Sequence, residues 1–164
     1  MNKFLFSLVA PVAVLLSFTS MPDRASFSGD WKLNEGKSEL GEFGGRFTPL
    51  AIKVDQKQDN IIIARTRPGF NGGDPVTSSV TLTFDGKETE STGFGNSKTK
   101  STAKWSDDSQ TLTINSVSTF ERDGQTSEIK ATETWTLSKE GSLTVAAVST
   151  SARGEFKTKA VYNK

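Results

Sequence analysis

The chain has 164 residues, enough for one domain with a hydrophobic core, and 34% of them are hydrophobic. It contains no histidine and no cysteine, which excludes disulfides, catalysis by an imidazole or a thiol, and most transition-metal sites. Outside the first 22 residues, which contain Lys3 as their single charged residue, 19 basic side chains (20 − 1) balance 19 acidic ones. This balance does not favour nucleic acid or anionic lipid as a partner.

Residues 1–22 have the pattern of a cleavable export signal. Lys3 gives a positive start, residues 4–16 are apolar except for a serine and a proline, and small residues follow. The apolar run is too short to span a bilayer, so an uncleaved membrane anchor is the weaker interpretation and no stable membrane span is expected. Without cysteine, lipid attachment at an N-terminal cysteine is excluded. We expect a secreted or periplasmic bacterial protein that is trimmed near residues 19–25 and folds as one domain over 23–164.

The remaining chain has the features of β-strands. Threonine, serine and valine are abundant, apolar and polar residues alternate, and no segment shows a sustained helical repeat. Asp85-Gly86, Asp123-Gly124 and residues 139–141 lie between alternating runs, as tight hairpins require. The predicted fold class is all-β, an antiparallel up-and-down β-barrel of about 8–10 strands in a meander. The alternation places strands near residues 27–34, 49–56, 60–66, 76–84, 87–93, 98–106, 110–121, 126–138, 142–150 and 155–163.

The turns predict which residues face one another. A two-residue loop at Asp123-Gly124 places Ile114 opposite Glu133, and a three-residue loop at 139–141 places Glu133 opposite Ala147. Two turns chosen independently therefore give one consistent inward face. The predicted pairs are Phe120–Ser127, Ser118–Ile129, Ser116–Ala131, Ile114–Glu133, Leu112–Trp135, Leu137–Leu143, Trp135–Val145 and Glu133–Ala147.

The predicted inward face is large and apolar at one end but small in the middle, and aromatic residues border the other end. This pattern favours a barrel that is filled at one end and has room for a small guest, since small barrels otherwise fill their interiors with side chains. The alternative is a flattened sheet whose small residues let its two faces touch. The predicted ligand-binding residues are Ser101, Ala103, Ser116, Ser118, Ala131, Glu133 and Ala147, with a rim of Phe94, Phe120 and Phe156.

Glu133 is the exception on this face, because an unpaired carboxylate inside a barrel is costly. Three interpretations stay open. Glu133 pairs with a buried cation, for which Arg65 is the best inward-facing candidate; or it anchors a ligand; or a local bulge turns it outward.

Gly29-Asp30-Trp31, followed by a long connection and a meander of hairpins, resembles the lipocalin and fatty-acid-binding-protein (calycin) superfamily, including uncharacterised secreted bacterial lipocalin-like proteins. The resemblance implies structural roles for Gly29 and Trp31 at the closed end of the barrel. It also implies a cation over Trp31, for which Lys159 and Lys164 are candidates. Fatty-acid-binding relatives hold a carboxylate with an Arg-x-Tyr in the last strand; here Ala160 takes the arginine position and only Tyr162 remains. No counterpart of their helical lid is expected in residues 35–48.

Two functional classes follow from these observations. The first is an exported barrel that binds or carries a small, largely apolar ligand in its interior. The second is a protein-interaction module, an inhibitor or envelope assembly factor, that acts through the loop rim; Phe43, Phe47 and Phe70 suit either class. We expect a monomer and neither an enzyme nor a cofactor. No metal site is expected either, because residues 107–109 lack the spaced ligands of a calcium loop.

Overall fold

The computed structural model describes residues 23–69, 72–92, 97–122 and 124–164. Within these ranges ten strands follow one another, with two short helical segments after the first strand. The alternation in the sequence predicted each strand to within about two residues, which is the usual uncertainty of element ends. The elements are β1 (Gly29–Leu33), η1 (Glu35–Lys37), α1 (Gly41–Phe47), β2 (Ala51–Gln56), β3 (Asn60–Arg67), β4 (Val76–Thr83), β5 (Thr89–Thr92), β6 (Lys98–Trp105), β7 (Leu112–Arg122), β8 (Gln125–Leu137), β9 (Leu143–Ser151) and β10 (Gly154–Asn163).

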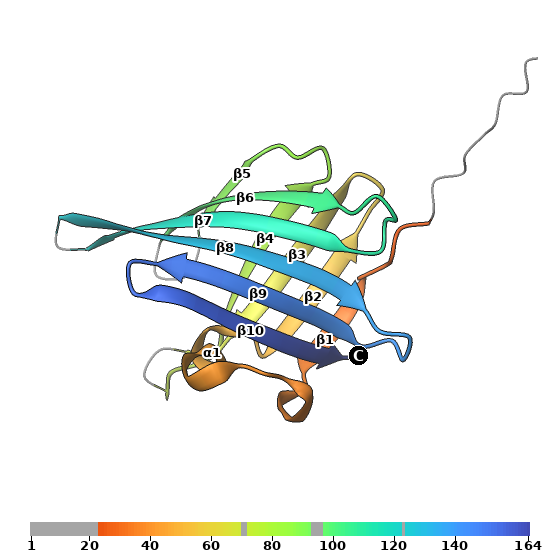
Figure 1. The fold of residues 1–164 in the computed structure, drawn as a ribbon, viewed down its shortest axis with the longest axis horizontal. Helices are drawn as coiled ribbons and strands as arrows, with labels where there is room; N and C mark the ends of the chain where they lie inside the picture. Colours follow the sequence, from red (N-terminus) through yellow and green to blue (C-terminus); the bar gives the residue numbers. More distant parts are fainter. Residues whose placement is uncertain (1–22, 70–71, 93–96, 123) are drawn as a thin grey trace, which may run out of the picture.

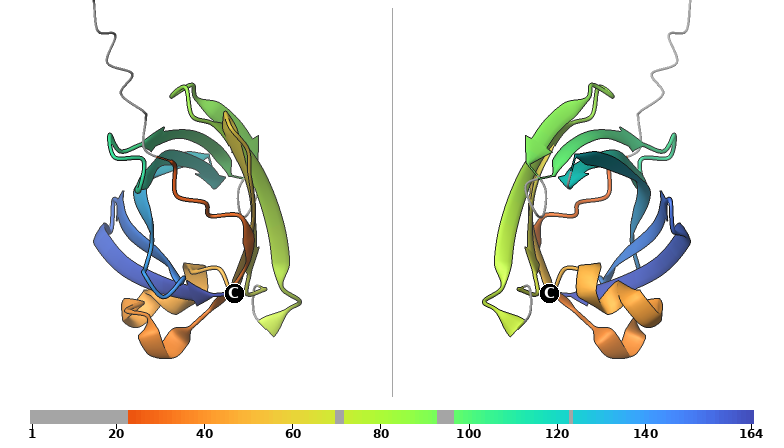
Figure 2. Two further views of the ribbon diagram at one scale, coloured as in Figure 1. Left: turned by 90° about the vertical axis from the view of Figure 1, so that its right-hand side faces the viewer. Right: turned by 90° about the vertical axis from the view of Figure 1, so that its left-hand side faces the viewer.

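The ten strands form one antiparallel sheet that curls into a nearly closed barrel, as Figures 1 and 2 show. The order is β4-β3-β2-β1-β10-β9-β8-β7-β6-β5, so the chain meanders and its first and last strands are neighbours. The edge strands β4 and β5 approach each other without pairing in the described part of the chain. The predicted fold class, an all-β up-and-down barrel, is confirmed.

The strand register agrees with the register that the turns predicted. Ile114 faces Glu133, and Glu133 faces Ala147, in ladders that run without interruption through these positions. Gly124, the second residue of the Asp-Gly turn, has φ +73°, a backbone conformation that glycine adopts without steric cost. The pairing is regular at Glu133, so the interpretation that a bulge turns this residue outward is wrong.

One end of the barrel is closed by the segment that precedes β1. Phe27 lies across this end, stacked on Trp105 with ring centroids 5.5 Å apart and edge-on to Trp135 at 5.8 Å. Its amide donates to Gln56 Oε1, and the Phe27 carbonyl accepts from Trp31 Nε1 at 2.7 Å. Through these contacts Phe27 and Trp135 are fully buried and Trp105 is partly buried at the filled end of the barrel.

Trp31 is buried at this closed end, as the Gly-x-Trp pattern implied. The ammonium of Lys164 lies 5.0 Å from the centroid of the Trp31 ring, within cation–π range. The other candidate cation, Lys159, instead pairs with Glu39 on the connection after β1. The chain thus has the cation over tryptophan that the family resemblance implied, supplied by its last residue.

Residues 35–48, where no counterpart of the relatives' helical lid was expected, contain two short helical segments. Residues 35–37 form the 3-10 turn η1, and the seven-residue helix α1 follows at 41–47. Three glycines give α1 a poor intrinsic propensity, so its stability comes from packing against the barrel. A Cβ at Gly44 would lie 2.8 Å from Thr158 Cγ2 on β10, which shows how closely the helix approaches this strand. Such a contact depends on three-dimensional structure and leaves no periodic signal in the sequence.

Candidate functional site

The inward-facing residues form layers whose solvent exposure rises along the barrel. In the layer at the closed end, Leu112 and Trp135 are fully buried opposite each other. In the layer nearer the loops, Ser116, Ala131 and Ser149 are only half-buried, although their side chains share the face of the core residues. This gradient favours an interior that is less filled toward the loop end than at the closed end.

The accessible half of the barrel has a surface of small and hydroxyl-bearing side chains. Ser101, Ser116 and Ala131 are cross-strand neighbours in one layer, and Thr99 and Ser118 exchange a hydrogen bond of 2.8 Å in the next. We use the term accessible half for the inward-facing residues on the loop side of Glu133. They are Thr99, Ser116, Ser118, Phe120, Ala131, Ser149 and Phe156, together with Ser101, which is buried at 7% exposure.

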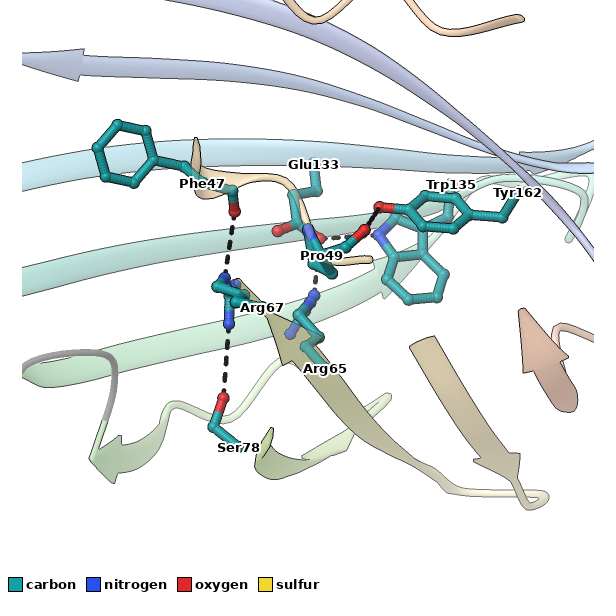
Figure 3. Close-up of polar contacts among 8 residues, drawn as sticks. All are labelled: Phe47, Pro49, Arg65, Arg67, Ser78, Glu133, Trp135 and Tyr162. Atoms are coloured by element: carbon teal, nitrogen blue, oxygen red, sulfur yellow. Dashed lines mark hydrogen bonds and ion pairs between the residues drawn. The ribbon is translucent and has the colours of Figure 1, made fainter. Parts of the chain in front are cut away.

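Glu133 lies where the buried and accessible parts meet, and it is paired with Arg65. Glu133 Oε2 lies 2.7 Å from Arg65 Nη2 and also accepts a hydrogen bond from Trp135 Nε1 at 2.9 Å (Figure 3). Because β3 and β8 are five strands apart in the sheet order, this ion pair crosses the barrel interior. The Arg65 guanidinium also lies over the Trp135 ring, 5.6 Å from its centroid. The interpretation that Glu133 pairs with Arg65 is confirmed.

The environment of Glu133 keeps its carboxylate charged. Burial by itself raises the pKa of Glu133, but Arg65, the Trp135 indole N–H and Arg67 outweigh it and hold this pKa below its ordinary value. The side chain retains 23% of its exposure, and that of Arg65 retains 12%. The pair is therefore mostly withdrawn from water, and its charges are satisfied by each other and by the indole.

Two further residues surround this pair in Figure 3. Tyr162 is buried on β10 and donates its hydroxyl to the Pro49 carbonyl at 3.1 Å, so its phenol holds the segment after α1. Burial and the Glu133 carboxylate raise the pKa of Tyr162, which keeps the hydroxyl a donor. Arg67, on the same face of β3 as Arg65, donates to the Phe47 carbonyl at 3.2 Å and to Ser78 Oγ at 3.5 Å.

The structure brings most of the predicted ligand-binding residues together on one inward surface. Ala103 is fully buried beside Ile114, so it belongs to the core layer and is not accessible to a guest; Ser101, in the next layer, is also buried. Ala147 is half-buried opposite Glu133, and Phe120 is half-buried on the part of the β7–β8 hairpin that projects beyond β9 (Figure 1). Phe156 lies at the rim and is 41% exposed. Phe94 and Phe70, and the side chain of Phe43, lie outside the described residues.

Arg67 is the residue of this site that the sequence analysis did not identify. The signal was present, because residues 61, 63, 65 and 67 share one face of β3 by alternation and the first two are core isoleucines. Because residue 67 follows residue 65 on this inward face, the same alternation predicts a second arginine inside the barrel. The α1 segment, whose Phe47 carbonyl accepts from Arg67, carried no corresponding signal.

No group of three or more acidic side chains in the described ranges could hold a metal ion. None of the helices in these ranges combines the length and apolar character needed to cross a bilayer.

Comparison with known proteins supports the fold. No family profile matches the chain, and no curated protein matches it in sequence. Among solved structures it is similar to zebrafish ileal bile acid-binding protein complexed with cholic acid, with a TM-score of 0.52 and 18% sequence identity. The match covers 84% of this chain and 98% of that one. The chain therefore has the same type of barrel fold as that protein, in agreement with the fold that the sequence resemblance implied.

Proposed function

We propose that this protein binds a small, largely apolar molecule in the accessible half of its barrel, and that it does so as an exported protein. The observation that carries the proposal is the incomplete burial of the inward-facing Ser116 and Ala147, whose neighbours toward the closed end, Ile114 and Val145, are buried. Ala131, next to Ser116 in the same layer, is also only half-buried. Small side chains at mid-barrel leave volume that a guest can fill, and burial of apolar ligand surface supplies the binding free energy.

The similar structure is that of a bile acid-binding protein complexed with cholic acid, a small amphiphilic molecule, and this agrees with a binding function for the same fold. A fold alone does not determine function. The binding function proposed here is supported by the inner surface of the barrel. That surface combines hydroxyls with aromatic residues at the rim. It suits a guest with an apolar body and a few polar groups.

One observation favours the alternative, an interaction module that acts through the loop rim. Phe47 is 66% exposed and Val76 is 51% exposed, and both lie beside Arg67, where the barrel opens. Exposed apolar side chains gathered in one place are typical of binding surfaces. Both residues adjoin the inward-facing Arg67, Phe47 through its carbonyl and Val76 through the β3–β4 pairing, so they also suit the first function.

Native mass spectrometry of the protein purified from its own host separates the two functions. A small mass that is lost on denaturation supports interior binding, whereas a stoichiometric second polypeptide supports the interaction module. A neutral, environment-sensitive dye such as phenylnaphthylamine should also bind the purified protein with near one-to-one stoichiometry. A protein that carries no guest and takes up no dye contradicts the proposed function.

A further inference from the structure

The polar cluster inside the barrel carries more positive than negative charge. Arg65 and Arg67 lie two residues apart on β3 and face the interior, where Glu133 is the carboxylate that interacts with both. Glu133 contacts Arg65 and Trp135 directly, and among the described residues it makes no hydrogen bond or ion pair with Arg67. The cluster therefore has two guanidinium groups and one carboxylate.

The described residues give Arg67 only neutral acceptors. Its bonds to the Phe47 carbonyl and to Ser78 Oγ measure 3.2 and 3.5 Å, at the long end of the hydrogen-bond range. Burial lowers the pKa of Arg67, and the neighbouring Arg65 lowers it further, while Glu133 and Tyr162 offset part of the effect. A guanidinium stays protonated in such a place, so the barrel holds a cation that is incompletely compensated.

Arg67 is also placed where a ligand could reach it. It is the last residue of β3 and lies opposite Val76, the first residue of β4, which is 51% exposed. Phe47, whose carbonyl accepts from Arg67, is 66% exposed on α1. Figure 3 shows Arg67 between Phe47 and Ser78, with the Arg65–Glu133 pair beside it. Val76 therefore places an exposed apolar residue beside this cation, which suits a ligand with a charged end and an apolar body.

We propose that the ligand carries one anionic group and that Arg67 binds this group at the loop end of the barrel. The planar guanidinium presents parallel N–H donors that match a carboxylate, a sulfonate or a phosphate. The apolar body of the ligand extends from Arg67 into the accessible half, toward Ala131. This inference rests on the proposed function and adds to it the chemical class of the ligand. The anion would then be bound from β3. The last strand cannot bind it as it does in the fatty-acid-binding relatives, because Ala160 takes the position of their arginine.

Two dyes that share one aromatic body test the inference. Anilinonaphthalene sulfonate carries an anion, and phenylnaphthylamine is the same body without the sulfonate. We would titrate both into the wild type, Arg67→Gln and Arg67→Lys, with Arg153→Gln as the matched control. Arg153 is exposed in the β9–β10 turn, so its substitution changes the net charge equally without touching the interior. Thermal unfolding of each variant shows that it is folded.

We expect Arg67→Gln to weaken sulfonate binding by about tenfold or more relative to the neutral dye, the effect of losing a charge-assisted hydrogen bond. Arg67→Lys should lose less, and Arg153→Gln should leave the ratio of the two dissociation constants unchanged. An unchanged ratio in Arg67→Gln overturns the inference, as does an equal change in Arg153→Gln. If Arg67→Gln does not fold, the ratio of the two dissociation constants is compared between the wild type and Arg67→Lys, which keeps the charge but not the paired donors. An unchanged ratio in Arg67→Lys then overturns the inference. If neither dye binds the wild type, the proposed function itself fails, which is a different outcome.

Discussion

Replacing Glu133 by leucine should destabilise the protein by about 3–5 kcal/mol, the usual cost of removing one partner from a buried ion pair. Glu133 Oε2 accepts from both Arg65 and Trp135, so the substitution leaves a guanidinium without its counter-charge and a fully buried indole N–H without an acceptor. Glu133→Gln retains an acceptor oxygen for one of these donors and should lose only about 1–3 kcal/mol. Urea unfolding at neutral pH measures each loss in free energy.

A double substitution separates the charge effect from a packing effect. Arg65→Met combined with Glu133→Leu removes both charges, so it should be less destabilised than Glu133→Leu alone. Glu128→Gln is the matched control, because Glu128 lies on the same strand in an exposed pair with Lys130 and should change stability by less than about 1 kcal/mol. Arg65→Met alone is also measured. If the double variant loses at least as much free energy of unfolding as Arg65→Met and Glu133→Leu lose together, the charge effect is contradicted.

The same pair predicts a dependence on pH. The folded-state pKa of Glu133 lies below its ordinary value of 4.5, so the unfolded chain takes up this proton at a higher pH than the folded protein. The stability that the carboxylate contributes is therefore complete above 4.5 and is lost as the pH falls through the folded-state pKa. We expect the advantage of the wild type over Glu133→Gln to shrink as the pH is lowered from about 5 toward 3. A constant difference over that window contradicts the low pKa.

Three further predictions concern the barrel and its processing. Trp31→Ala should lower the free energy of unfolding by about 3–5 kcal/mol, as truncation of a large buried aromatic does, and an unchanged urea midpoint would show that Trp31 is not a core residue. Gly44→Ala should destabilise α1 through its clash with Thr158, whereas Gly45→Ala, with open space at its Cβ, should be neutral or stabilising; equal midpoints for the two variants would contradict the close approach. Intact-mass measurement on the secreted or envelope fraction should find a chain trimmed near residues 19–25, and finding the first residue still present would rule out cleavage of an export signal.

The strands and their register could be predicted because local chemistry determines them. The Asp-Gly turn fixes the β7–β8 register, and the alternation of side chains then determines that Glu133 points inward. A carboxylate that points inward requires a partner, and the alternation of side chains in β3 predicted that Arg65 also points inward. Each step used residues close together in sequence, together with the general cost of burying charge.

Other parts of the site depend on contacts between distant segments. Phe27 was predicted to begin the first strand, but it lies outside β1 and covers Trp105 and Trp135, a position set by the shape of the closed end. Helix α1 forms although its glycines disfavour it, because Gly44 fits against β10. The charge imbalance at Arg67 becomes visible only once Glu133 is seen to contact Arg65. These features come from packing, which sequence alternation does not encode.

The open interior is tested most directly by filling it. Ala147 faces inward opposite Glu133 and is half-buried, whereas its neighbour Ala146 faces outward and is exposed. Phenylnaphthylamine titrations should show that Ala147→Phe loses binding while its urea midpoint stays close to that of the wild type. Ala146→Phe should bind the dye as the wild type does. If the wild type binds no dye and Ala147→Phe is destabilised by about 1–3 kcal/mol, the cost of overpacking a filled core, the interior is solid and the account is contradicted.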